Sequence, residues 1–84
     1  MIRWRGRAER AAARRAAEHQ GRQIVTAADW VITLAYREAP GGPLRVTPAD
    51  VQRWAAEHFL LDVPAAVAAD VLEDRLRLRG GAGF

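Results

Sequence analysis

Apolar positions in the last sixty residues recur at helical spacing in three segments, each with polar positions between them. The segment at about residues 27–39 is apolar nearly all round, which is typical of a central helix. Residues 48–60 and 64–75 each carry one apolar stripe, which indicates amphipathic helices. The three stripes are Trp30, Val31, Ile32, Leu34, Ala35 and Tyr36; Val51, Trp54, Ala55, His58 and Phe59; and Val67, Val71, Leu72 and Leu76. We expect these stripes to pack together as the core.

Two of these helices are preceded by the same start signal, Val-Thr-x-Ala-Asp, at residues 25–29 and 46–50. In both, the threonine (Thr26 or Thr47) is the expected N-cap and the acid faces the helix dipole. Only the start signal matches, so we interpret it as convergent capping rather than an internal repeat. The run Pro-Gly-Gly-Pro at residues 40–43 ends the first helix, and Asp-Val-Pro at 62–64 begins the third.

Residues 1–22 predict a further helix of a different kind. Residues 7–20 are almost wholly alanine, arginine, glutamate and glutamine, which are good helix formers, and Gly21 is the expected stop. Four arginines at i, i+4, i+7 and i+11 project in nearly one direction, whereas Arg15 points elsewhere; the four are Arg3, Arg7, Arg10 and Arg14. The other faces are mostly alanine, so this helix gains little from burial.

Strict alternation of arginine and leucine at residues 75–79 predicts either a short strand or the last turns of a helix. Residues 44–46 are the other strand candidate, and the two segments could pair as a minimal ribbon. The expected fold is therefore all-α, with a three-helix core, an N-terminal basic helix and a minimal two-stranded wing. The expected organisation is a basic arm at 1–22, a compact helical domain at 23–79 and a flexible Gly-rich tail at 80–84.

Charge separates the arm from the rest of the chain. Residues 1–22 hold seven arginines and two glutamates, a net charge of +5, whereas residues 23–84 hold six arginines and eight acids, a net charge of −2. The whole chain of 84 residues carries +3, which fits one small domain with a basic interaction arm.

The residue types that are absent argue against catalysis. The chain contains no serine, cysteine, lysine or asparagine, which excludes the commonest nucleophiles and the phosphate-loop lysine. Neither His19 nor His58 has a second histidine or a cysteine three or four residues away, so we expect no metal site, no cofactor and no enzymatic activity. His58 and Tyr36 are interpreted as packing residues, and Trp30 and Trp54 as core.

The order helix, short strand, helix, turn, helix and arginine-rich strand over residues 26–79 resembles the winged helix-turn-helix family of DNA-binding domains. This resemblance implies that residues 64–75 are a recognition helix and that Leu76–Arg79 begin a wing. Arg77 and Arg79 would then reach phosphates. The recognition-helix segment exposes several acids, which repel DNA, so we place the main contact on the arm instead.

The leading hypothesis is a small non-catalytic accessory or regulatory protein that binds nucleic acid. The expected contact residues are Arg3, Trp4, Arg5, Arg7, Arg10, Arg14, Arg15, Arg77 and Arg79, with Trp4 able to stack on a base. The alternative is a protein–protein module or a small subunit of a larger assembly that docks the arm on an acidic protein, and a merely solvated arginine face is a third interpretation. Homodimerisation through the same helix is compatible with the first two.

Membranes rank below these partners, because the arm lacks the large apolar side chains that insert into lipid. The N-terminus has no apolar signal core, and the longest apolar run, residues 63–69, is far shorter than the ~20 residues of a membrane helix. We therefore expect a cytoplasmic protein.

Overall fold

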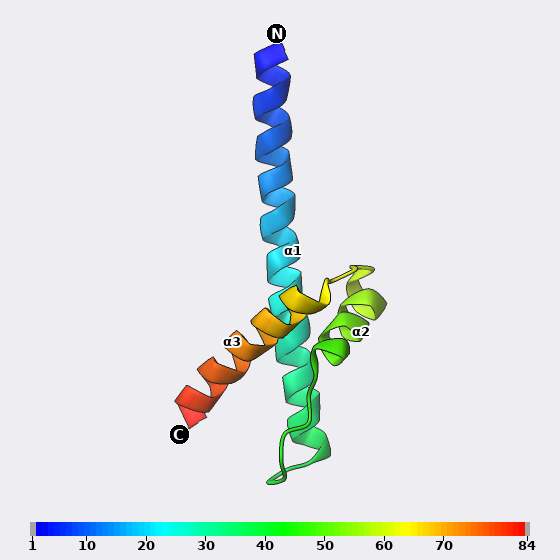
Figure 1. Cartoon of the computed structure of the whole chain (residues 1–84), viewed down its shortest axis with the longest axis vertical. Coiled ribbons are helices and arrows are strands. Elements are labelled where there is room, and N and C mark those ends of the chain that lie inside the picture. The colour runs from blue at the N-terminus through cyan, green and yellow to red at the C-terminus, as the bar shows by residue number, and fades with distance from the viewer. Residues whose placement is uncertain (1, 84) are drawn as a thin grey trace.

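The computed structural model describes the backbone of residues 2–83 and the side chains of residues 6–79. Three helices make up the described chain: α1 (Ile2–Glu38), α2 (Pro48–Phe59) and α3 (Ala65–Gly83). Each helix packs against the other two, with α2 and α3 on the C-terminal half of α1 (Figure 1). The expectation of an all-α fold is confirmed.

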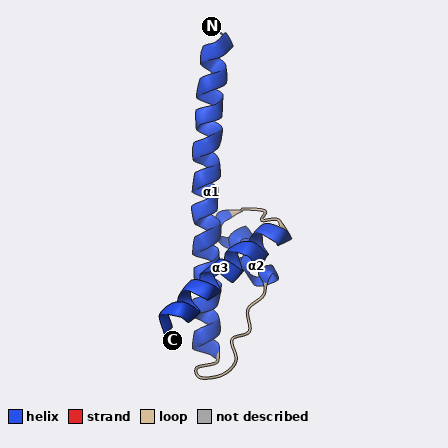
Figure 2. Cartoon of the chain, turned by 60° about the vertical axis from the view of Figure 1, so that its left-hand side comes forward, coloured by secondary structure: helices blue, strands red, loops and turns tan. Residues whose placement is uncertain are grey.

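The wing predicted from the sequence is wrong, because residues 2–83 contain no strand (Figure 2). Residues 44–46 lie in the connection between α1 and α2, and residues 76–79 are part of α3. The helix turns about 100° per residue, so the alternating leucines diverge: Leu76 packs against the core, and Leu78 is 60% exposed. The helical backbone also continues past Gly80, where the Gly-rich tail was expected to begin.

α1 joins the basic arm (residues 1–22) to the compact domain of residues 23–79, which we call the body, without a break. Gly21 does not end the helix, and Thr26 is not an N-cap; both predictions are wrong. Inside the helix, the Thr26 hydroxyl donates a hydrogen bond to the carbonyl of Arg22 at 2.9 Å. A single glycine costs a helix only about 1 kcal/mol, and good helix formers lie on both sides of it. The helix ends at Glu38, just before the Pro-Gly-Gly-Pro run.

The N-cap predicted for α2 is confirmed. The Thr47 side chain accepts a hydrogen bond from the backbone N–H of Asp50, and the Thr47 N–H donates to the Asp50 carboxylate at 2.8 Å. This reciprocal pair, with Pro48 in the first turn, fixes where the helix begins. At the other end, Leu60 closes the helix in the left-handed conformation, at φ 52°.

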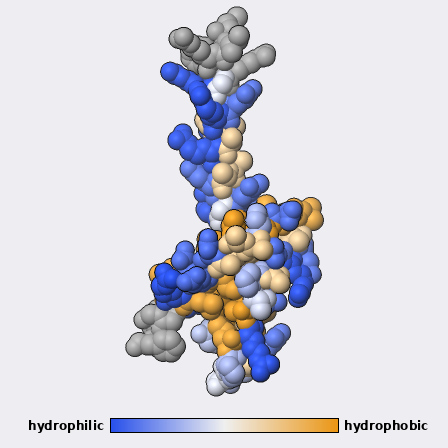
Figure 3. Space-filling model, viewed as in Figure 1, coloured by the Kyte–Doolittle hydropathy of each residue, from blue (hydrophilic) through white to orange (hydrophobic). Residues whose placement is uncertain are grey.

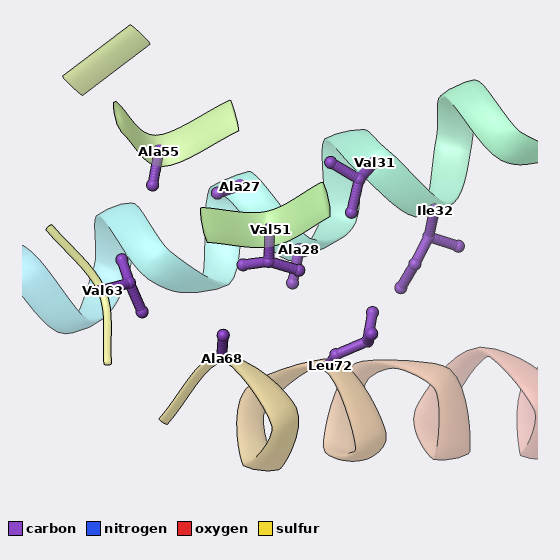
Figure 4. Close-up of a cluster of buried hydrophobic side chains, with 9 residues drawn as sticks. All are labelled: Ala27, Ala28, Val31, Ile32, Val51, Ala55, Val63, Ala68 and Leu72. Carbon is purple, nitrogen blue, oxygen red and sulfur yellow. The ribbon is translucent and has the colours of Figure 1, made fainter. Parts of the chain in front are cut away.

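The core lies where the three helices meet, and small and branched side chains fill it (Figure 4). Its buried members are Ala27, Ala28, Val31, Ile32, Val51, Ala55, Val63, Ala68 and Leu72. The expected stripe on α3 is shifted, because Ala68 is buried while Val67 is 39% exposed. On the other helices, Trp30 is 44% exposed and His58 is exposed, so neither belongs to the buried core.

The molecule is elongated, with principal extents of 60 × 27 × 18 Å. The length comes from α1, whose 37 residues span about 55 Å at 1.5 Å per residue. Its N-terminal half projects alone beyond α2 and α3 (Figure 1). No helix in the described part of the chain is both long and apolar enough to span a bilayer.

Candidate functional site

The projecting half of α1 presents a row of exposed arginines to solvent. Arg7, Arg10 and Arg14 are all exposed, and the projecting rod is mostly hydrophilic in Figure 3. The three side chains border one shallow hollow together with Ala11. None of the three forms an ion pair with another described side chain. We call Arg7, Arg10 and Arg14 the arginine stripe.

The arginine stripe lies on the side of α1 that faces α2 and α3 further down the helix. The spacing of its members continues through Ala17, Gly21 and Ile24 to the buried Ala28, alternating by three and four residues. The stripe covers about 10 Å of helix axis at 1.5 Å per residue. Three guanidinium groups are therefore held in a line by a rigid backbone, above the body of the protein.

The remaining contact residues predicted from the sequence do not join this row. The side chains of Arg3, Trp4 and Arg5 lie outside the described residues. Arg15 is exposed, but it points about 100° away from Arg14 around the helix.

The two C-terminal arginines are occupied elsewhere. Arg77 pairs with Glu73 at 2.9 Å and with Asp74 at 3.8 Å on its own helix. Arg79 donates a hydrogen bond to the Thr33 hydroxyl of α1 at 3.1 Å. Thr33 lies about 28 Å along the helix axis from Arg14, so neither arginine meets the arginine stripe.

An ion pair that the sequence did not reveal fixes α3 on α1. Arg75 donates from Nε to one carboxylate oxygen of Asp29 at 2.9 Å and from a terminal nitrogen to the other at 3.0 Å. The hydrogen bond to Asp29 and the negative charge of Asp29 raise the pKa of Arg75 above its ordinary value. The local sequence predicts Asp29 at a helix start, and no local signal links two residues 46 positions apart.

Opposite charges occupy separate parts of the molecule. Side chains 6–22 include five arginines and two glutamates, a net charge of +3, whereas side chains 23–79 carry −2. On α3, the acids Asp70, Glu73 and Asp74 are exposed. The basic charge of the arm is therefore not neutralised by packing against the acidic body.

Aromatic rings form a stack at the surface where α1 and α2 meet. The ring centroids of Trp30 and Trp54 are 6.2 Å apart, and those of Trp54 and His58 are 3.8 Å apart, with nearly parallel planes. His58 Nδ1 lies 3.0 Å from the Trp54 carbonyl, which only accepts hydrogen bonds, so this nitrogen carries the proton. The stack gives His58 a packing role, as expected, while leaving Trp30 partly exposed.

The described side chains hold no group of three or more histidines, cysteines, aspartates or glutamates that could bind a metal ion. The arginine stripe is therefore the candidate functional surface among the described residues. Comparisons with protein-family models, with curated proteins and with solved structures found no significant match to this chain.

Proposed function

We propose that this protein binds nucleic acid through the arginine stripe, by contacts to the phosphate backbone. The observation that carries the proposal is the line of three exposed guanidinium groups on a helix that projects from an otherwise acidic body. Arginine presents forked donors that match phosphate oxygens, and it remains charged at every physiological pH.

The dimensions of the arm suit a duplex groove. An α-helix with its side chains is about 10–12 Å wide, and the major groove of DNA is about 12 Å wide. The face of the arm roughly opposite the arginine stripe carries alanines at Ala8, Ala12 and Ala16, which keeps this helix slender. The arm can therefore approach a groove closely enough for its arginines to reach the phosphates on the groove edges.

This contact is expected to be insensitive to base sequence. Arginines that neutralise phosphates release counterions, so the logarithm of the binding constant falls with log salt by about 0.9 per contact. Three contacts then give a slope of about −3, and non-specific affinities of this kind are about 10⁻⁴–10⁻⁶ M. The protein would act as a non-catalytic binder rather than a reader of one site.

Fluorescence anisotropy of labelled duplex and single-stranded DNA, titrated at several salt concentrations, tests the proposal. Replacing Arg7, Arg10 and Arg14 together by glutamine is expected to remove most of the binding and of its salt dependence. The matched control replaces Arg37, Arg45 and Arg53, which are exposed on the body, by glutamine and so changes the net charge equally.

Retained binding in the stripe variant, or equal loss in both variants, would show that the arginine stripe is not the site. Absence of binding by the unchanged protein at low salt would also contradict the proposal. In that case the arm would be expected to bind an acidic protein partner. The corresponding assay measures binding to a polyanionic peptide and its dependence on salt.

A further inference from the structure

One face of α1 in the body is only partly covered by α2 and α3. Thr26, Trp30, Thr33 and Arg37 line a shallow pocket there, together with Asp29. Trp30 is 44% exposed and the neighbouring Leu34 is 38% exposed. Two large apolar side chains thus remain partly exposed on this face, although Trp54 of α2 stacks on Trp30 at one edge and Arg79 of α3 contacts Thr33 at the other.

The same face of the helix, followed into the arm, carries the small side chains of three alanines together with His19. At about 100° per residue, Ala8, Ala12 and Ala16 lie within the same narrow sector as Trp30 and Leu34. All three alanines are exposed. The long helix therefore has large apolar side chains at one end of this face and small ones at the other.

The large and small positions are arranged symmetrically about residue 21. Ala8 and Leu34 are equally far from it, as are Ala12 and Trp30, and as are Ala16 and Thr26. If two copies of α1 lie antiparallel with this face between them, each alanine meets its counterpart on the other copy. Trp30 then packs over Ala12 of the second copy, and Leu34 over Ala8, so large side chains occupy the space that small ones leave.

Charge favours the antiparallel arrangement over the parallel one. Antiparallel overlap about residue 21 places side chains 6–19 of one copy, with net charge +2, beside residues 23–36 of the other, with net charge −1. A parallel pair would set the two basic arms side by side, where like charges repel. The second copy also gives the projecting arm a surface to pack on, which a single chain does not provide.

We infer that the protein forms an antiparallel homodimer in which the alanine face of each arm covers Trp30 and Leu34 of the other copy. The interface is isologous, with its two-fold axis passing beside residue 21. It goes beyond the proposed nucleic-acid binding and does not depend on it.

The dimer leaves the arginine stripe free. Arg7, Arg10 and Arg14 lie roughly opposite the Ala12 face around the helix. The two stripes of a dimer therefore point outward on opposite sides. Such a dimer would bind two separate nucleic-acid segments, one with each stripe, instead of contacting a single segment with both stripes.

The first test is the oligomeric state of the protein at concentrations from 1 to ~100 µM, measured by sedimentation equilibrium without nucleic acid. A dimer is expected, and Ala12→Glu is expected to weaken it at least about tenfold by burying a charge. Ala17→Glu is the matched control, because Ala17 is an equally exposed alanine of the arm on a different face. It should leave the dimer intact.

The second test fixes the orientation. The chain has no cysteine, so an introduced thiol is unique. Protein carrying Ala16→Cys, mixed with protein carrying Thr26→Cys, should form a disulfide-linked mixed dimer under mild oxidation. Neither variant alone should cross-link at a comparable rate, because in an antiparallel pair centred on residue 21 the two copies of position 16, like those of position 26, lie about 15 Å apart along the helix axis.

A protein that is monomeric at ~100 µM, an Ala12→Glu variant that dimerises normally, or rapid self-linkage of Ala16→Cys would each overturn the inference. The DNA titration of the Ala12→Glu variant separates the two proposals. A monomeric Ala12→Glu variant that still binds DNA supports the arginine stripe independently, whereas an unchanged protein that is dimeric but binds no DNA supports the interface alone.

Discussion

The two halves of α1 are one continuous helix, but different forces stabilise them. Residues 23–38 contribute Ala27, Ala28, Val31 and Ile32 to the core, where packing against α2 and α3 holds the backbone. Residues 6–22 have almost entirely exposed side chains, and they rely on helix propensity and on continuity with the packed half. Because an isolated helix of this length is marginal in water, the body supplies the nucleus from which the arm extends.

This difference means that the same kind of substitution should have different effects in the two regions. In the body, a buried side chain stabilises the fold because folding removes its apolar surface from water. In the arm, an exposed alanine stabilises the helix only through its helix propensity. The proposed function follows the same division, since the arm offers charge and reach while the body offers a fixed anchor.

The largest effect is expected from Ile32→Ala, because Ile32 is fully buried between the helices. Such a truncation leaves a cavity and costs about 2–4 kcal/mol, a large fraction of the stability of a small domain. Urea denaturation followed by circular dichroism measures this loss. Ala12→Gly in the arm should lower the unfolding free energy of the body by far less, and similar losses in both variants would contradict the division drawn here.

A smaller effect is expected when the contact between α1 and α3 is weakened. Arg75→Gln removes a two-pronged ion pair with Asp29 whose side chains are each about one-third exposed, which should cost about 1 kcal/mol after solvent screening. Arg77→Gln is the control, because its partners Glu73 and Asp74 lie on its own helix and the pairs are largely exposed. Its cost should stay within about 0.5 kcal/mol, measured by the same denaturation. Equal losses would show that the Asp29 contact does not fix α3.

The smallest effect is expected at Gly21, and it should be confined to the arm. A Cβ at this position meets nothing within 4 Å, so Gly21→Ala adds helix propensity without a clash. The substitution should stabilise the continuous helix at residue 21 by about 0.8–1 kcal/mol. Backbone amides of residues 7–20 should then exchange with solvent about fivefold more slowly. The midpoint of urea unfolding of the body should hardly move. Unchanged exchange in the arm would show that Gly21 does not limit its helicity.

The two start signals, which differ only in having Ala27 or Pro48 after the threonine, show how far local sequence could define this fold. At Thr47 the preceding residues follow a Pro-Gly-Gly-Pro break, so a new helix must begin and the threonine caps it. At Thr26 the preceding residues are good helix formers, and the threonine instead bonds back to Arg22 within the helix. Pro48 and the residues that precede each threonine therefore decided the outcome. The arm and body thus became one helix rather than two.

The candidate site was predictable to a similar extent. Helical spacing placed Arg7, Arg10 and Arg14 on one face, and the structure leaves all three exposed. The positions of Arg77 and Arg79 were not predictable, because the alternating pattern suits a strand while the packing of Leu76 keeps the chain helical. Contacts such as that of Arg79 with Thr33 depend on how α3 crosses α1, which no local pattern encodes.

Because the helix continues without interruption through Gly21, the direction in which the arm's side chains point is fixed relative to the body. One extra residue there would turn the arginine stripe by about 100° and advance it by 1.5 Å, aiming it away from its present side. Seven extra residues would complete nearly two turns, restoring its direction to within about 20° while lengthening the rod by about 10 Å. Any insertion in this helix therefore changes two things together: the distance of the arginines from the body and the direction in which they point.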